Sequence, residues 1–264
     1  MRESAGTPPE ADREQVLVVP RHALFDGRWP HGFTPLESCG DDIATRLEHA
    51  ASLMDREAAE RDPDFKQPIP YCAVRRGDDI LCVERLPKQG ETRLHGKLSI
   101  GLGGHVGPED LATDGSTTGA IQRALHRELA EELVLPGGLP EPRFVGLIHD
   151  DSTPVGAVHV GLAFVLDVPL STPSDAVQLR EILKMRGGFR RLAGDGGAWQ
   201  DAPSLESWSA VLLDVCLGDI GRSVSTGPSR IPRSGAPSSP PGSALRTQAK
   251  ESGNGGAQDS ETVA

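Results

Sequence analysis

The sequence has few aromatic residues and no excess of basic charge. Aromatic residues make up 4% of the 264 positions, and the formal net charge at pH 7 is −11. Proteins that bind nucleic acid polymers need basic surface against the phosphate backbone, so this composition argues against such a polymer as a partner. It also gives no indication of a base-stacking site. An acidic protein can still bind a small polyphosphate where metal ions cancel the charge locally.

Cysteines are also few, and they lack the spacing of a metal site. The four thiols are scattered along the chain, at Cys39, Cys72, Cys82 and Cys216. This usage predicts reduced thiols in a cytoplasmic protein. No apolar run is long enough to span a bilayer, and Met1 to Gln15 are too polar and acidic for a signal peptide, so we expect no membrane partner.

Low hydrophobicity, with abundant glycine and proline, predicts a folded region between disordered ends. Hydrophobic residues make up 37% of the chain, beside 31 glycines and 22 prolines. Segments 1–14 and 219–264 carry too little apolar surface to offset their ordering entropy, so we expect both to be disordered. Between them, we expect a strand and helix extension over 15–65, packed on a core domain over 66–218.

Apolar periodicity predicts strands and helices that alternate along the folded region. The expected helices are 41–61, 117–135 and 205–217, the last with Ser204 as a candidate cap. The expected strands are 15–19, 69–75, 79–85, 143–149, 155–168 and 189–192. Arg76-Gly77-Asp78 joins the second and third strands into a hairpin. This order predicts an α/β or α+β fold with a mixed β-sheet.

Three glutamates on one predicted helix carry the chemical information. Glu128, Glu131 and Glu132 fall at positions i, i+3 and i+4, which places their carboxylates on one face within one turn. Like charges this close repel each other, and a hard divalent cation such as Mg²⁺ would relieve the repulsion. Arg127 can brace the carboxylates through charge-assisted hydrogen bonds. Without further context, a solvated acidic helix face is the commoner interpretation of such a run.

A glycine pair upstream changes that interpretation. Gly103-Gly104 follows a predicted strand, and such glycines let the backbone approach an anionic ligand. The combination resembles the Nudix (MutT-like) hydrolase family, whose box is G-x5-E-x7-R-E-U-x-E-E-x-G-U, with U aliphatic. Gly104 matches the first glycine, and 127–132 match R-E-U-x-E-E. Segments 94–106 and 150–159 resemble a bacterial MutT-like branch of predicted phosphoesterases, and this likeness runs from about 15 to 217.

The match to the box has two departures. The loop between Gly104 and Arg127 is longer than in the box, with an insertion placed near 108–117. Counted back from Arg127, the first Glu of the box falls on Gly119 and its final Gly on Val134. The first Glu is usually structural, so its loss does not remove the metal ligands.

The resemblance implies a fold, an activity and a cofactor. The fold would be a mixed β-sheet sandwiched between α-helices. The activity would be metal-dependent hydrolysis of the diphosphate linkage in a nucleoside diphosphate-X substrate. Mg²⁺ or Mn²⁺ would be held by Glu128, Glu131 and Glu132, with Arg127, Glu128 and Glu131 in catalytic roles.

Further residues are candidates for substrate binding. They lie around the glycine pair and at a later turn and strand: Lys97, Gly103, Gly104, His105, Asp151 and His159. The general base stays open among Glu128, Glu131, Asp150, Asp151 and His159. The alternative to an enzyme is a non-catalytic nucleotide-sensing or interaction module on the same fold. Many Nudix relatives are dimers, so a homodimer is a further expectation.

Overall fold

The computed structural model describes residues 13–25, 30–39, 42–86, 97–111, 115–180, 185–192 and 205–219. The segments predicted to be disordered lie outside these ranges, apart from Arg13, Glu14 and Asp219. The helices are α1 (Arg21–Leu24), α2 (Leu36–Cys39), α3 (Asp42–Ala50), α4 (Arg56–Ala59), α5 (Thr117–Glu132), α6 (Pro154–Val158) and α7 (Ser207–Asp219). The strands are β1 (Gln15–Pro20), β2 (Gly32–Pro35), β3 (Ser52–Asp55), β4 (Phe65–Arg76), β5 (Asp79–Arg85), β6 (Leu98–Ser99), β7 (Gly101–Leu102), β8 (Leu133–Val134), β9 (Arg143–His149), β10 (His159–Asp167), β11 (Gln178–Leu179) and β12 (Met185–Arg191).

A mixed sheet forms the centre of the fold. Its strands follow the order β12-β5-β4-β10-β9-β2, and β1, β3, β6 and β7 attach beside this path. β10 pairs with β4 in parallel and with β9 antiparallel. The hairpin predicted through Gly77 is confirmed, since Arg76 pairs with Asp79 where β4 turns into β5.

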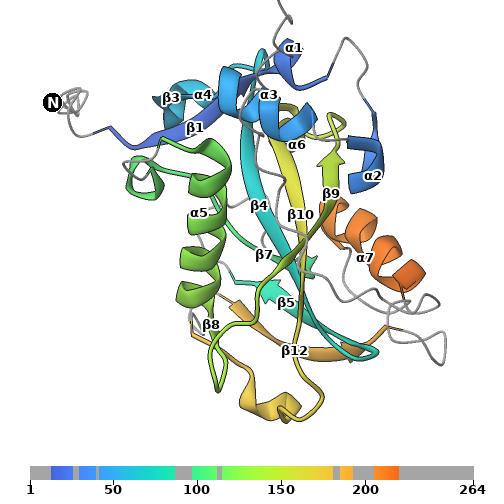
Figure 1. The fold of residues 1–264 in the computed structure, drawn as a ribbon. Helices are drawn as coiled ribbons and strands as arrows, with labels where there is room; N and C mark the ends of the chain where they lie inside the picture. Colours follow the sequence, from blue (N-terminus) through green and yellow to red (C-terminus); the bar gives the residue numbers. More distant parts are fainter. Residues whose placement is uncertain are drawn as a thin grey trace, which may run out of the picture. The chain divides into compact units, whose positions relative to one another are not determined.

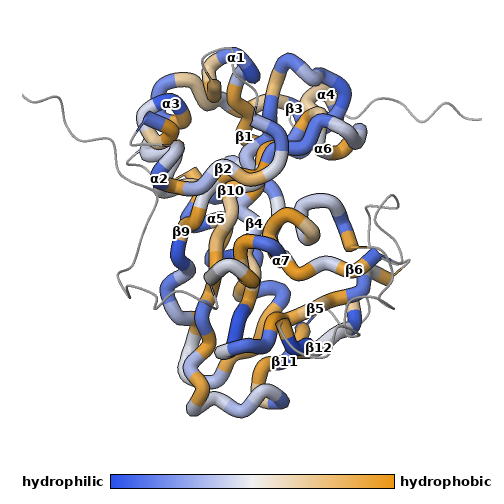
Figure 2. The backbone as a smooth tube through the Cα atoms, turned by 90° about the vertical axis from the view of Figure 1, so that its right-hand side faces the viewer, coloured by the Kyte–Doolittle hydropathy of each residue, from blue (hydrophilic) through white to orange (hydrophobic). Residues whose placement is uncertain are grey.

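Helices cover both faces of this sheet (Figure 1). α5 packs on one face through Ile121, Leu125 and Leu129, which recur every fourth residue and so share one side of the helix. α7 packs on the other face through Leu212 and Cys216. Figure 2 shows hydrophobic residues along α7 and along β5 beside it. The predicted sheet between helices is therefore confirmed.

The predicted helix over 41–61 is wrong in extent. α3 ends at Ala50, and β3 and the single turn α4 follow it. Met54, which fits the helical stripe in the sequence, lies in β3 and pairs with Val16 of β1. β1 needs partners for its backbone groups, and β3 supplies them, so tertiary pairing overrides the helical pattern.

The predicted strand over 155–168 is also wrong at its start. α6 comes first, because the Thr153 side chain accepts a hydrogen bond from the Gly156 amide at 3.0 Å and Pro154 occupies the first turn. Smaller shifts occur elsewhere. The helix predicted to reach 135 ends at Glu132, and the strands predicted from 69 and from 189 begin at Phe65 and Met185. Ser204 lies outside the described residues.

A carboxylate from another helix fixes the start of α5. Glu48 of α3 accepts hydrogen bonds from the backbone amides of Thr117 at 2.8 Å and Thr118 at 2.9 Å. Burial pushes the pKa of Glu48 upward, but its hydrogen bonds with Thr118, Thr117 and Ser116 outweigh burial, so the pKa is lowered. A carboxylate that stays charged at a helix N-terminus is favoured by the helix dipole. α3 thereby orients the helix that carries the three glutamates.

Two further sequence expectations concern thiols and membranes. The four cysteines are thiols and not disulfides, and Cys72, Cys82 and Cys216 are buried. In the described ranges, no helix combines the length and the hydrophobicity that a membrane crossing requires.

Candidate active site

Arg127 connects α5 to the loop that follows β7. Its guanidinium contacts Glu128 at 2.7 Å and Asp110 at 2.9 Å, and it donates to the His105 carbonyl at 3.0 Å. The hydrogen bonds with Asp110, and then those with Glu128, raise the pKa of Arg127 above its ordinary value, so this side chain stays charged. Arg127 therefore holds the helix and the glycine loop in one arrangement.

Glu128 lies against the backbone of Gly104. A Cβ atom at Gly104 would sit 2.5 Å from a Glu128 carboxylate oxygen, so the missing side chain is what leaves room for the carboxylate. The Glu128 side chain is 17% exposed. Burial raises its pKa, and the hydrogen bond from Arg127 opposes that shift. A carboxylate beside open backbone can share a cation with an anionic ligand.

The backbone conformation and close surroundings at position 103 require a glycine. Its φ is +149°, and a Cβ atom there would sit 1.9 Å from the Pro70 carbonyl oxygen of β4. The glycine loop thus approaches the central strand more closely than any residue with a side chain permits.

We expect Gly103→Ala to lower the free energy of unfolding by at least about 1–3 kcal/mol, the usual cost of a strained backbone conformation. Urea unfolding of the purified variant measures this. Gly188→Ala is the matched control, because a Cβ atom at Gly188 would meet nothing within 4 Å beyond its chain neighbours. Equal stability of the two variants would contradict the proposed constraint.

The three glutamates of the predicted metal site lie in different surroundings. The Glu131 side chain is 57% exposed, whereas Glu132 is buried with 6% exposure. Arg127 Nη1 is 2.7 Å from a Glu128 oxygen and 3.6 Å from a Glu131 oxygen, so these two carboxylates flank one nitrogen. Carboxylate oxygens are hard ligands of the kind that Mg²⁺ takes together with water. Glu132 is enclosed at the end of the helix.

A cleft of about 440 Å³ opens beside this arrangement. Its lining includes Gly104, Arg127 and Glu128, joined by Arg13 and Arg56 from the N-terminal elements. Arginines suit phosphate oxygens because their donors form paired hydrogen bonds. The cleft is therefore lined both by a carboxylate, which can hold a cation, and by arginines, which can bind phosphate.

Asp110 takes the place that the sequence alignment gave to Gly119. It stands at the G-x5 spacing from Gly104, its side chain is 4% exposed, and it accepts hydrogen bonds from Arg127 and from the Gly107 amide. Gly119 instead lies in the first turn of α5 and donates to Ser116. The extra residues therefore follow Asp110. Counting forward from Gly104, instead of back from Arg127, would have found this acid.

His105 and His159 were predicted separately, and the structure brings them together. Their Nε2 atoms are 3.2 Å apart, and Glu60 Oε1 lies 3.8 Å and 3.7 Å from them. Burial, and then the charge of Arg56, lowers the pKa of His105 to about 3. Sequence reasoning missed Glu60 because its segment was placed inside a long helix.

Asp151 and Lys97 do not line the cleft. Asp151 is bonded to Lys66 and Arg21, and His149 Nε2 lies 3.0 Å from it. Burial pulls the pKa of Asp151 upward, but the hydrogen bond and charge of Lys66, together with the charges of His149 and Arg21, outweigh burial, so the pKa is lowered. Lys97 is half-buried just before β6. Of the predicted substrate-binding residues, Gly104 and His105 are those in the cleft lining.

The fold around this site defines a class of proteins. The structure matches the solved "Crystal structure of Tm1382, a putative Nudix hydrolase" with a TM-score of 0.58 and 26% identity. The match covers 78% of this chain and 99% of that one. The protein therefore has the Nudix fold, as its glycine loop and glutamate helix predicted.

The sequence places it within a narrower group. The chain belongs to the family of Protein YmaB of Bacillus subtilis (strain 168), with 35% identity over 209 residues, which are 76% of this chain and 97% of that relative. No family model matches the sequence. The likeness to a branch of predicted phosphoesterases stays a prediction.

Proposed function

We propose that the protein is a metal-dependent hydrolase that cleaves the diphosphate linkage of a nucleoside diphosphate-X substrate. The observation that carries this proposal is the Glu128 carboxylate, which Arg127 holds against the Gly104 backbone at the edge of the cleft. The Nudix fold supports it, since enzymes of that class are named for such hydrolysis. The same site has arginines that can bind phosphate and glutamates that can bind Mg²⁺ or Mn²⁺.

The residues of the site divide the tasks of the proposed reaction, and Glu131 takes two of them. Glu128 and Glu131 would hold the divalent ion, with Glu132 as a third ligand after its side chain turns outward. When bound, that ion neutralises phosphate charge and lowers the pKa of a coordinated water. Arg13 and Arg56 bind phosphate oxygens, and the open backbone at Gly104 admits the diphosphate.

Glu131 is our candidate for the general base. It is largely exposed and lies beside Glu128 across one Arg127 nitrogen. Asp150 and Asp151, two of the other carboxylates considered, are held by hydrogen bonds to Ser152 and to Lys66. Neither Asp150 nor Asp151 lines the cleft, whereas Glu131 lies beside Glu128, which does.

Removal of divalent ions is expected to abolish turnover, and Mg²⁺ or Mn²⁺ is expected to restore it. The purified chain is screened against dinucleoside polyphosphates, nucleotide sugars, NADH, ADP-ribose and oxidised dNTPs, before and after chelation. Full turnover by the chelated protein would contradict the mechanism. Tight binding of a nucleotide with no turnover across the panel would instead favour the sensing module.

Further expectations, from composition and from the Nudix resemblance, belong to the same proposal. We propose a cytoplasmic location, a homodimer, and neither a nucleic acid polymer nor a membrane as partner. Sedimentation of the purified chain tests the dimer directly.

A further inference from the structure

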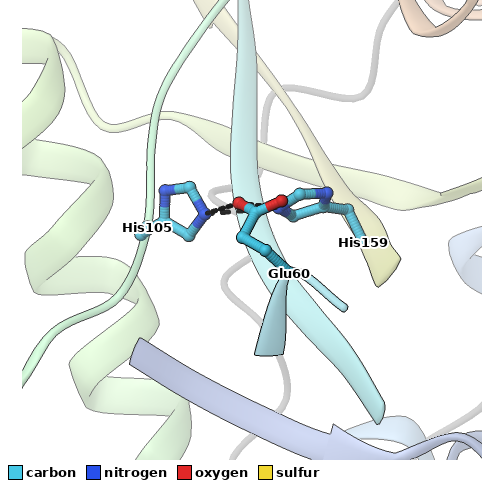
Figure 3. Close-up of side chains that lie close together, drawn as sticks. All are labelled: Glu60, His105 and His159. Carbon is cyan, nitrogen blue, oxygen red and sulfur yellow. Dashed lines mark hydrogen bonds and ion pairs between the residues drawn. The ribbon is translucent and has the colours of Figure 1, made fainter. Parts of the chain in front are cut away.

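Three potential metal ligands, none of them on the glutamate helix, converge at one point. Figure 3 shows Glu60, His105 and His159 directed toward one another from three separate segments. Their ligand atoms all lie within 4.8 Å of one another, and among the described residues no other group of His, Cys, Asp or Glu meets that condition. Glu60 caps α4, His105 follows the glycine pair, and His159 begins β10.

Hydrogen bonding sets the tautomer of His159. Its Nδ1 lies 2.7 Å from the Val155 carbonyl oxygen, which can only accept, so Nδ1 carries the proton. Nε2 of the same ring then presents its lone pair toward His105 and Glu60. A backbone carbonyl that fixes the other ring nitrogen is the usual support of a metal-binding histidine.

A hydrogen bond between the two histidines explains only part of this geometry. His105 Nε2 could donate to His159 Nε2 over 3.2 Å, but Glu60 would stay 3.7–3.8 Å from both nitrogens, beyond hydrogen-bond distance. A Zn²⁺ ion with bonds of about 2.0–2.1 Å separates tetrahedral nitrogen ligands by about 3.3 Å. The observed separation of the nitrogens fits one shared ion, and the carboxylate needs only a small movement to join them.

The surroundings are compatible with a cation. The positive charge of Arg56 contributes to the lowered pKa of His105. Arg56 is paired with Glu14 at 2.6 Å, and the carboxylate of Glu14 offsets the charge of Arg56. The side chains of Glu60 and His105 are 23% and 22% exposed, whereas that of His159 is 6% exposed. His105 also lines the cleft. Two ligands are therefore reachable from solvent, and the third anchors the group.

We infer that Glu60, His105 and His159 form a second metal site, specific for a borderline transition metal and best suited to Zn²⁺. Two imidazoles and one carboxylate favour Zn²⁺ over Mg²⁺, which takes oxygen ligands. Three protein ligands leave a fourth position open for water or another ligand. This site stands apart from the proposed function, because its ligands are not the glutamates of α5.

Zinc binding to the full chain, without substrate, tests this inference. The protein is stripped with a chelator, and Zn²⁺ is then added during calorimetry. We expect one tight Zn²⁺ per chain, and a loss of affinity greater than about 100-fold in His105→Gln, His159→Gln and Glu60→Gln, since changes outside the ligand set alone cost about 10–100-fold. Co²⁺ supplies a second measurement, because its visible absorption reports imidazole ligation.

Two control variants separate this site from other metal binding. His126→Gln removes a histidine that lies 3.6 Å from Glu141 but has no second histidine beside it. Glu128→Gln removes the main ligand proposed for catalysis. Both should bind Zn²⁺ as the wild type does, and Zn²⁺ should raise their melting temperatures but not that of Glu60→Gln.

Failure of the wild type to bind stoichiometric Zn²⁺ would overturn the inference, as would a Zn²⁺ affinity of Glu60→Gln and His105→Gln equal to that of the wild type. Both results would leave the hydrolase proposal standing, because turnover is measured separately with Mg²⁺. Conversely, a Glu128→Gln variant that keeps turnover would count against the hydrolase mechanism and not against the zinc site.

Discussion

Glu128→Gln is expected to lower turnover of the cleaved diphosphate by at least about 10³-fold. A metal acting as a Lewis acid contributes several kcal/mol to transition-state stabilisation, and each 1.36 kcal/mol is a factor of ten in rate. Glutamine keeps the size of the side chain and can still accept from Arg127 through its oxygen. It loses the charge that a divalent ion requires, so the fold should persist while the chemistry fails.

The measurement is kcat and kcat/KM over a range of Mg²⁺ concentrations. Glu141→Gln serves as control, because Glu141 is a partly exposed carboxylate beside His126, away from the cleft. We expect the control to match the wild type. A Glu128→Gln enzyme with normal turnover and an unchanged Mg²⁺ dependence would show that this carboxylate does not hold the catalytic ion.

Local patterns in the sequence predicted much of the fold. The helix over α5, the glycine loop and the hairpin at Gly77 each depend on residues close together in the chain, and all three are found. The glycine pair was informative because its chemistry is local. Gly103 needs a backbone conformation that side chains disfavour, and Gly104 needs space beside Glu128.

Contacts between distant segments could not be read in the same way. Glu48 caps α5 from another helix, and Glu60 meets two histidines from other elements. Neither acid has a local motif. The apolar stripe over 41–61 predicted one long helix, so β3 and α4, the elements that precede Glu60, were not expected. Asp110 did have a motif spacing, but alignment from the wrong end of the loop concealed it.

Asp151 shows that an acidic residue at one place in the sequence is compatible with either of two roles, substrate binding or a structural ion pair. As an acid after a strand, it was predicted to bind substrate, and the structure surrounds it with cations. Lys66, whose side chain is fully buried, hydrogen-bonds Asp151 and the carbonyls of Gly156 and Ala157. Burial lowers the pKa of Lys66, and Asp151 opposes that shift. We therefore expect Asp151 to act mainly on stability.

Asp151→Asn is expected to reduce the free energy of unfolding by about 2–3 kcal/mol. This is less than the roughly 3–5 kcal/mol found when one partner of a fully buried ion pair is removed, because Lys66 is fully buried but the Asp151 side chain is 29% exposed. The asparagine leaves Lys66 buried without its counter-charge, and it also removes the partner of Arg21. Urea unfolding at neutral pH measures the loss. Asp78→Asn is the control, because Asp78 pairs with Arg191 at an exposed position, where ion pairs contribute about 0–1 kcal/mol.

Acid titration gives the same prediction a second measurement. The pKa of Asp151 is lower in the folded protein than its ordinary value of 3.8, so the unfolded chain binds the proton first as pH falls. The stabilisation is then complete above that ordinary value and disappears as pH falls through the lower folded pKa. Asp151→Asn should lack this part of the acid-induced loss. If Asp151→Asn kept wild-type stability but raised KM for a cleaved diphosphate, the stability role would be wrong. Asp151 would then be a substrate-binding residue, because a residue that contacts substrate affects binding without holding Lys66 in the core.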